Sequence, residues 1–303
     1  MRVCASVFRL TVSRLLYSVL ILFTFLAFAP RTAVSQESQK DQIETGRYIF
    51  ALAGGCACHT VPKGTPHAGG RAFPVPAGKL YSTNITSSNE NGLGGWANAQ
   101  IYAAMVKGIR PDGVRLLPVM PYEAYSGMAE EDITALLDHL KTLKPASTAN
   151  FPLDAWIPFY RSLWTPIWLK FFGRFNIPPP RAPQQGIERG RYLVEHVSLC
   201  GDCHTPRNIF GVAKRNLYLA GAKVGPLGQE IPNITPDKRT GIGDWSRDQI
   251  ATSLLTGIKP DQEPMEGLMA EVIEGGYKYM KRQDALAIAD YLKSIPPVAN
   301  RIK

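Results

Sequence analysis

Long apolar runs are scarce in this chain of 303 residues, because the only one stands near the N-terminus. That scarcity excludes a protein that crosses a membrane several times by helices. No run of clustered lysine or arginine is present, so binding to nucleic acid is not expected. No long segment alternates with a period of two, which disfavours a sheet protein. The chain also lacks a nucleophile triad, a P-loop and a G-x-G-x-x-G motif, so no dehydrogenase chemistry of its own is expected.

The N-terminal segment has the layout of a signal peptide. Three arginines accompany an apolar run at 15–29, which is shorter than the roughly 20 residues of a spanning helix. Small residues at 33–35 then offer a cleavage site. We predict that 1–35 is a signal peptide and the mature protein periplasmic, with an uncleaved anchor as the alternative. Removal of 1–35 leaves 30 basic against 25 acidic residues and lowers the net charge from +9 to +5.

The rest of the chain repeats itself, and its length suits about two domains. From Asn84 to Met120 the offset between matching residues is constant at 149, so Met120 corresponds to Met269. The matching segments include G-R-Y at 46–48 and 190–192, C-H-T at 58–60 and 203–205, N-I-T at 84–86 and 233–235, and G-I-R/K-P-D at 108–112 and 257–261. We predict one domain at 38–147 and a second at 187–299, separated by an aromatic and proline-rich linker at 148–186.

Each half ends in an amphipathic helix that a proline follows, predicted at 131–143 and at 284–295. Glycine and proline together make 51 of 303 residues, about 17%, which indicates short helices joined by loops. We therefore predict an all-α fold, in which each domain has little apolar core for its size and packs around something else. Further helices are expected at 41–53, 97–106, 187–196 and 247–256.

The segment between the repeats is rich in aromatic residues and leaves two hypotheses open. These residues either pack into the cleft between the domains or form an amphipathic patch that docks on a membrane or a membrane-bound partner. The second hypothesis predicts peripheral membrane contact through 150–177. The aromatic residues are Trp156, Phe159, Tyr160, Trp164, Trp168, Phe171, Phe172 and Phe175.

The second repeat contains C-G-D-C-H at 200–204, which is the attachment signature of c-type haem. Cys200 and Cys203 lie about one helical turn apart, so both thiols can bond to the vinyl groups of one porphyrin. His204 then lies beneath the iron as a ligand. A zinc knuckle would need a second ligand pair nearby, and a redox dithiol would need a βαβ context. Neither is present, and a disulfide is the remaining alternative.

The first repeat contains C-A-C-H at 56–59, with one residue fewer between its cysteines. The tyrosine-to-histidine span is 11 residues here and 12 in the second repeat, so one residue is missing inside or just before the motif. Cys58 and His59 keep their relation, and one thioether and the iron ligand remain available. Cys56 either reaches the second vinyl group or stays free. A first domain without haem is the alternative.

The sixth ligands follow from the same alignment. Met120 and Met269 each lie 12 residues after a matching glycine, and 61 and 65 residues after the respective histidines. A thioether sulfur suits ferrous iron and raises the potential of a haem. We therefore predict His/Met ligation of two c-type haems. The other methionines, Met105, Met128, Met265 and Met280, are expected in the core.

With these motifs in place, the chain resembles the class I cytochrome c domains found in electron-transfer subunits of bacterial membrane-bound alcohol, gluconate and sorbitol dehydrogenases. The resemblance extends from about 46 to 298 and also rests on Y-S-T-N-I-T at 81–86 and V-M-P-Y at 119–122. It implies two tandem class I cytochrome c domains. Such subunits carry three haems, whereas this sequence ends after two repeats, so we expect no third haem.

The sequence thus predicts a dihaem carrier of single electrons, not itself an enzyme. Its expected partners are a dehydrogenase subunit or quinol-oxidising protein as donor, and a terminal oxidase or another cytochrome as acceptor. Two alternatives stay open. One is a dihaem enzyme, peroxidase-like or thiosulfate-oxidising, against which the methionines in both repeats argue. The other is a one-haem carrier whose first domain is a relic.

Overall fold

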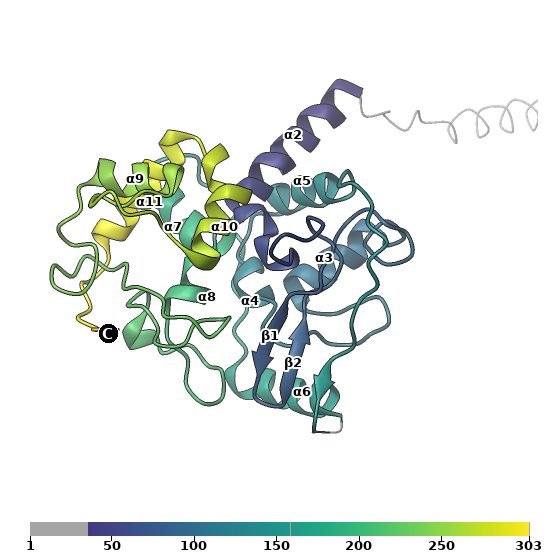
Figure 1. The fold of residues 1–303 in the computed structure, drawn as a ribbon. Helices are drawn as coiled ribbons and strands as arrows, with labels where there is room; N and C mark the ends of the chain where they lie inside the picture. Colours follow the sequence, from purple (N-terminus) through teal and green to yellow (C-terminus); the bar gives the residue numbers. More distant parts are fainter. Residues whose placement is uncertain (1–35, 158, 303) are drawn as a thin grey trace, which may run out of the picture. The chain divides into compact units, whose positions relative to one another are not determined.

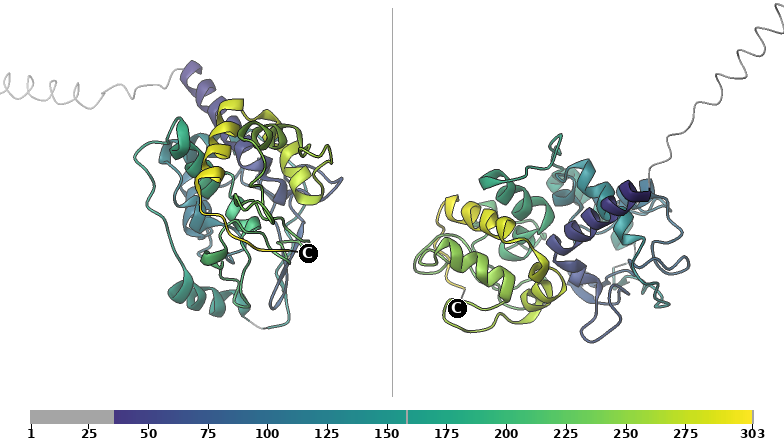
Figure 2. Two further views of the ribbon diagram at one scale, coloured as in Figure 1. Left: turned by 90° about the vertical axis from the view of Figure 1, so that its left-hand side faces the viewer. Right: turned by 90° about the horizontal axis from the view of Figure 1, so that it is seen from above.

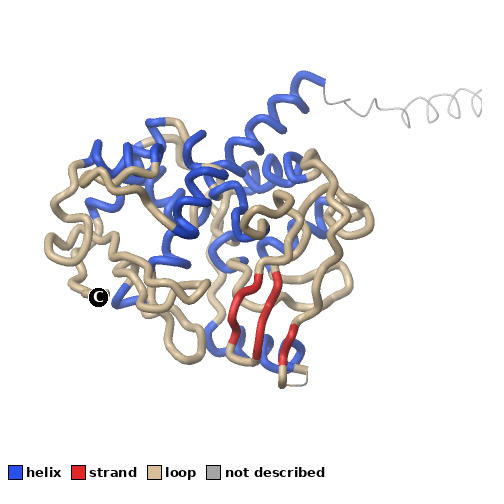
Figure 3. The backbone as a smooth tube through the Cα atoms, in the orientation of Figure 1, coloured by secondary structure: helices blue, strands red, loops and turns tan. Residues whose placement is uncertain are grey.

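The computed structural model describes residues 36–157 and 159–302 of the chain. The predicted signal peptide at 1–35 lies outside the described residues. Both repeats belong to one compact unit, Asp41–Lys303. Helices dominate the described residues and long loops join them, which confirms the all-α prediction (Figure 3).

The helices of the two repeats follow one another in the same order, with ends a few residues from those predicted. In Figure 1, α9 and α11 lie together beside α7, and α3 lies near α4 and α5; the contacts between these helices agree. The right-hand view of Figure 2 again shows the C-terminal helix, in yellow, beside α9. The first repeat comprises α2 (Gln36–Leu52), the 3-10 helix η1 (Gly54–His59), α3 (Asn98–Lys107), α4 (Tyr122–Tyr125) and α5 (Glu130–Leu140). The second comprises α7 (Gly186–Tyr192), the π-turn η2 (Leu193–Val197), α8 (Cys200–His204), η3 (Arg215–Leu217), α9 (Arg247–Thr256), α10 (Gly267–Gly275), η4 (Tyr277–Tyr279) and α11 (Arg282–Ser294).

Within each repeat, a glycine lets the first helix approach the last helix closely. A Cβ atom on Gly46 would lie 1.9 Å from the carbonyl oxygen of Ala135 in α5. A Cβ atom on Gly190 would lie 1.9 Å from the carbonyl oxygen of Ala287 in α11. Because any side chain at these points would push the helices apart, the repeated G-R-Y segment marks the helix crossing.

One continuous apolar core contains residues of both repeats. Leu52, Met128 and Ile133 from the first repeat and Leu193 and Ile288 from the second are fully buried in it. The two repeats therefore share one core, which agrees with the prediction that each half has little core of its own. Each repeat covers apolar surface of the other, and that burial stabilises both.

A small antiparallel sheet, not predicted from the sequence, pairs two strands of the first repeat with one strand of the segment between the repeats (Figure 3). Its strands are β1 (Ala72–Val75), β2 (Gly78–Tyr81) and β3 (Asp154–Ala155), and β1 pairs with β2 from Ala72 opposite Tyr81 to Val75 opposite Gly78. These strands are too short for a pattern of period two to stand out. Helix α6 (Tyr160–Phe172) packs beside the sheet through Tyr160, which shares a small apolar cluster with Ala77 and Leu117. No described helix is both long and apolar enough to cross a bilayer.

Candidate haem sites

The second attachment motif forms the short helix α8. Leu199 precedes it in the left-handed conformation, with φ 54° and ψ 37°. The helical turn that follows places Cys200 and Cys203 on one side of the backbone. The Nδ1 atom of His204 lies 2.8 Å from the carbonyl oxygen of Pro232. Since a carbonyl oxygen can only accept, Nδ1 carries the proton and the Nε2 lone pair is available for a metal.

The first motif holds its histidine in the same way. The Nδ1 atom of His59 donates to the carbonyl oxygen of Thr83 at 2.7 Å. Thr83 and Pro232 are 149 residues apart, the offset of the sequence repeat. Burial lowers the pKa of both histidines, so each imidazole is neutral and suited to bind a metal through Nε2.

Asparagines fix the two loops that carry these carbonyl groups. The side-chain oxygen of Asn84 accepts hydrogen bonds from the backbone N–H and the hydroxyl of Thr86. Asn233 makes the same pair of bonds with Thr235. Both amide groups donate to backbone carbonyls near the end of their own repeat. The N-I-T repeat therefore ties each histidine-binding loop to the body of its repeat.

The predicted sixth ligands are both half-buried and pack against the apolar core. Met120 lies just before α4, whereas Met269 lies in the first turn of α10. Their ligation of iron stays a prediction. The prediction that other methionines fill the core agrees with the burial of Met105, Met128 and Met280, while Met265 is half-buried.

The four cysteines of the two motifs are free and half-buried. Burial raises the pKa of Cys56, Cys200 and Cys203 to about 12 and also raises that of Cys58. Such thiols are protonated at neutral pH, unlike the reactive low-pKa thiol of a redox dithiol. Within the described part of the chain, no group of three or more Cys, His, Asp or Glu residues could hold a metal ion. The residues present therefore fit covalently attached haem better than zinc.

The two candidate sites adjoin. The pKa of Cys203 is raised by burial and, next in importance, by the nearby Cys58. Helix η1 packs against α10 of the other repeat. The buried guanidinium of Arg71 joins them, because its Nε atom donates to the carbonyl oxygen of Thr60 at 2.8 Å while its other end pairs with Glu271 of α10. Sequence reasoning did not single out this arginine, whose counterpart is Lys223, two residues after the shared A-G pair at 68–69 and 220–221.

A tyrosine of each repeat donates a hydrogen bond to an aspartate of the other repeat. The hydroxyl of Tyr48 donates to Asp284 at 2.7 Å, and that of Tyr192 donates to Asp132 at 2.7 Å. The tyrosines match in the G-R-Y repeat, and the aspartates lie 152 residues apart in matching helices. The interface therefore has an approximate two-fold symmetry. Each tyrosine oxygen also accepts a backbone N–H at 3.1 Å, from Lys281 and Ala129 respectively.

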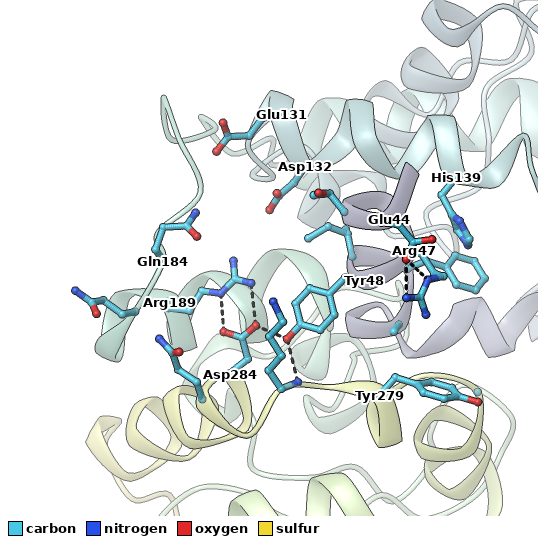
Figure 4. Close-up of a pocket in the computed structure, with 18 residues that line it drawn as sticks. Glu44, Arg47, Tyr48, Glu131, Asp132, His139, Gln184, Arg189, Tyr279 and Asp284 are labelled. Atoms are coloured by element: carbon cyan, nitrogen blue, oxygen red, sulfur yellow. Dashed lines mark hydrogen bonds and ion pairs between the residues drawn. The ribbon is translucent and has the colours of Figure 1, made fainter. Parts of the chain in front are cut away.

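An arginine makes this interface asymmetric. The guanidinium of Arg189 donates to both carboxylate oxygens of Asp284, at 2.9 and 3.0 Å (Figure 4). The matching position in the first repeat is Thr45, so Asp132 has no such fork. Burial raises the pKa of Asp132 above its ordinary value. Sequence reasoning missed this network, although the tyrosines stand in a repeat that it identified.

No protein-family model matches the chain. A dihaem c-type cytochrome of Cereibacter sphaeroides is 36% identical over 262 residues, which cover 84% of this chain and 86% of that protein. The fructose dehydrogenase cytochrome subunit of Gluconobacter japonicus is 36% identical over 275 residues, covering 89% of this chain and 56% of that subunit. The gluconate 2-dehydrogenase cytochrome c subunit of Pantoea cypripedii is 35% identical over 283 residues, covering 89% and 63%. The chain thus spans little more than half of the fructose dehydrogenase subunit.

The fold, the two attachment motifs and these similarities define a c-type cytochrome. The chain belongs to the family that includes dihaem c-type cytochromes and the cytochrome c subunits of these dehydrogenases. Its relatives are cytochrome c electron-transfer subunits, not catalytic enzymes themselves. The resemblance read from the sequence is confirmed.

Proposed function

We propose that the protein is a periplasmic dihaem cytochrome c. It passes single electrons between a dehydrogenase or quinol-oxidising partner and a respiratory acceptor, such as a terminal oxidase or another cytochrome. The observation that carries the proposal is the matched pair of histidines, His59 and His204, whose Nδ1 atoms are held by equivalent carbonyl groups. A relative named as a dihaem cytochrome supports two haems, and relatives named as dehydrogenase subunits support a dehydrogenase partner.

The residues of each motif have separate tasks in this proposal. The Nε2 atom of each histidine would hold the iron, and the sulfur atoms of Met120 and Met269 would supply its second protein ligand. Cys58, Cys200 and Cys203 hold the porphyrins covalently. The haem supplies an iron that gains and loses one electron, while the protein supplies ligands, burial and docking surfaces. Because Cys58 and Cys203 adjoin, haems held at the two sites would be neighbours within one molecule.

The proposal is tested on the full chain exported in a host that matures c-type cytochromes. Mass spectrometry under denaturing conditions and a pyridine haemochrome spectrum count the covalent haems, and fractionation of the cells gives the location. Two haems per chain are expected, and one or none would overturn the dihaem assignment. Met120→Ala and Met269→Ala should each change one reduced spectrum and lower one potential, whereas Met128→Leu serves as a core control. Unchanged spectra and potentials would refute the methionine ligands.

We further propose that α6 and its flanks contact an anionic membrane surface. Four apolar residues spaced four apart form one exposed stripe on this helix and its N-terminal cap, because that spacing returns to the same helical face. Tyr160 and Trp168 of the same helix are buried, so part of the aromatic segment packs inward. The exposed fractions along the stripe are 76% for Phe159, 62% for Leu163, 50% for Ile167 and 71% for Phe171.

The charge of the segment suits this surface. Residues 150–177 contain three basic residues and a single acidic one, Asp154. Apolar side chains flanked by basic residues favour the interface of anionic lipids. Sedimentation with phosphatidylglycerol vesicles should recover the cytochrome, and Leu163→Ser with Phe171→Ser should abolish recovery while leaving the haem spectrum unchanged. Equal recovery of the variant would refute this contact.

A further inference from the structure

The shortened motif of the first repeat would not work as a regular helix. In an α-helix, residues two apart point about 200° from each other around the axis, whereas residues three apart lie within about 60°. Cys200 and Cys203 are three residues apart, so a helical turn directs their thiols to the same side. Cys56 and Cys58 are two apart, so a regular helical turn would direct their thiols to opposite sides.

The backbone before Cys58 departs from a regular helix. Gly54, Gly55 and Cys56 all have positive φ angles, of 67°, 60° and 50°. In the second repeat only Leu199 has one at the corresponding place, just before the first cysteine. The left-handed conformation of Cys56 redirects its side chain relative to a right-handed turn. Three left-handed residues thus replace one, in a segment that is one residue shorter.

Beyond the cysteines the two motifs agree again. Thr60 and Thr205, which follow the histidines, are both extended, with φ −127° and −115°. The carbonyl oxygens of His59 and His204 each accept a hydrogen bond from a glycine N–H, at 2.8 and 2.7 Å. The difference between the repeats is therefore confined to the residues before Cys58.

The surroundings of Cys56 match those of Cys200. The first cysteine of each motif, Cys56 or Cys200, packs against the apolar core. The second cysteines, Cys58 and Cys203, are not among the residues packed against it. Each also lies by a matching buried tyrosine: Tyr125 interacts with Cys56 and Tyr277 with Cys200. These tyrosines are 152 residues apart, as are the aspartates of the interface.

The alternative place for the first thiol is closed. Gly55 stands where a standard C-x-x-C-H spacing would have its first cysteine. A Cβ atom on Gly55 would lie 2.2 Å from the carbonyl oxygen of Gly275 in α10, and one on Gly54 would lie 2.8 Å from Val272. Backbone atoms of the other repeat thus exclude a side chain from this position.

From this geometry we infer that Cys56 takes the place of Cys200 in the first repeat, so that Cys56 and Cys58 both bond to the first porphyrin. The inference rests on the proposed function. In each attachment the S–H group adds across a vinyl double bond: the sulfur bonds to the inner carbon, the proton goes to the terminal carbon, and no electrons are lost. Both cysteines are free thiols, as this addition requires.

Peptide mapping of the matured full chain tests the inference. Trypsin releases residues 48–63, which contain both cysteines, and residues 192–207, which contain the second motif. After denaturation and alkylation with iodoacetamide, peptide 48–63 should carry haem and no alkyl group, as should peptide 192–207. Haem plus one alkyl group on 48–63 would overturn the inference and leave the dihaem carrier intact. Absence of haem from 48–63 would overturn both.

A matched pair of variants gives a spectroscopic test. Cys56→Ala and Cys200→Ala each remove the first cysteine of one motif. If both cysteines form thioethers, each variant should move half of the haemochrome α band to longer wavelength, by the same amount. A wild-type spectrum that already contains such a component, and that Cys56→Ala leaves unchanged, would refute the second thioether.

Discussion

Replacement of Tyr192 by phenylalanine should destabilise the protein more than the same change at Tyr48, although the two tyrosines occupy matching positions. Each change removes one hydroxyl group. Without it, Asp132 has no hydrogen bond left among the described residues, and the buried N–H of Ala129 loses its partner. Without the hydroxyl of Tyr48, Asp284 keeps both bonds from Arg189. The backbone N–H freed by Tyr48→Phe belongs to an exposed residue and can bond to water.

The magnitudes follow from the groups left unpaired. A hydrogen bond to a charged group contributes about 1.5–3 kcal/mol, and a stranded buried donor costs about 1–3 kcal/mol more. We expect Tyr192→Phe to lower the free energy of unfolding by about 3–5 kcal/mol and Tyr48→Phe by about 1–2 kcal/mol. The second value is smaller because the arginine fork still compensates the carboxylate.

Urea unfolding of the haem-loaded variants, followed by far-ultraviolet circular dichroism, measures the difference. Haem content must be equal in the two samples, since a bound cofactor adds to stability. A cost at Tyr48 equal to or above that at Tyr192 would refute the reasoning. In an Asp132→Asn background the cost of Tyr192→Phe should fall, because no charged carboxylate remains to be stranded.

Three further predictions concern the backbone and the buried carboxylate. Gly46→Ala should lower the free energy of unfolding by about 3 kcal/mol, since its Cβ atom would overlap the carbonyl of Ala135. Thermal unfolding should show a much smaller effect for Gly275→Ala, whose Cβ atom would have no contact under 3.5 Å. Because the pKa of Asp132 is raised on folding, its contribution is complete below its unfolded pKa of about 3.9 and declines as the pH rises through the folded value. Asp132→Asn should flatten that part of the pH profile in urea titrations, and an unchanged slope would contradict the assignment. Gly55→Cys, which restores the standard motif spacing, should lower haem content per chain by gel staining, because the side chain meets the backbone of α10; an increase would contradict this.

The internal repeat made much of this protein predictable. Matching motifs, at offsets of 144 to 149 residues, predicted the paired histidines, the paired methionines and the helix-crossing segments. Periodicity predicted the terminal helices to within a few residues. Such features depend on short stretches of chain, where residue type and spacing decide the local conformation. The C-x-x-C-H motif is another such local feature, because one helical turn contains all of it.

Contacts between the repeats were beyond sequence reasoning. Tyr48 and Tyr192 each donate a hydrogen bond to an aspartate of the other repeat, and Arg71 pairs with Glu271. The carbonyl of Gly275 leaves no room for a side chain at Gly55. All of these contacts join residues far apart in the chain. No local pattern encodes such a pair, since its formation depends on how the whole unit packs. The sequence by itself determined which residues are the candidates for holding haem. Only the tertiary structure decided that a left-handed turn places Cys56 like Cys200, because packing against the other repeat selects that backbone.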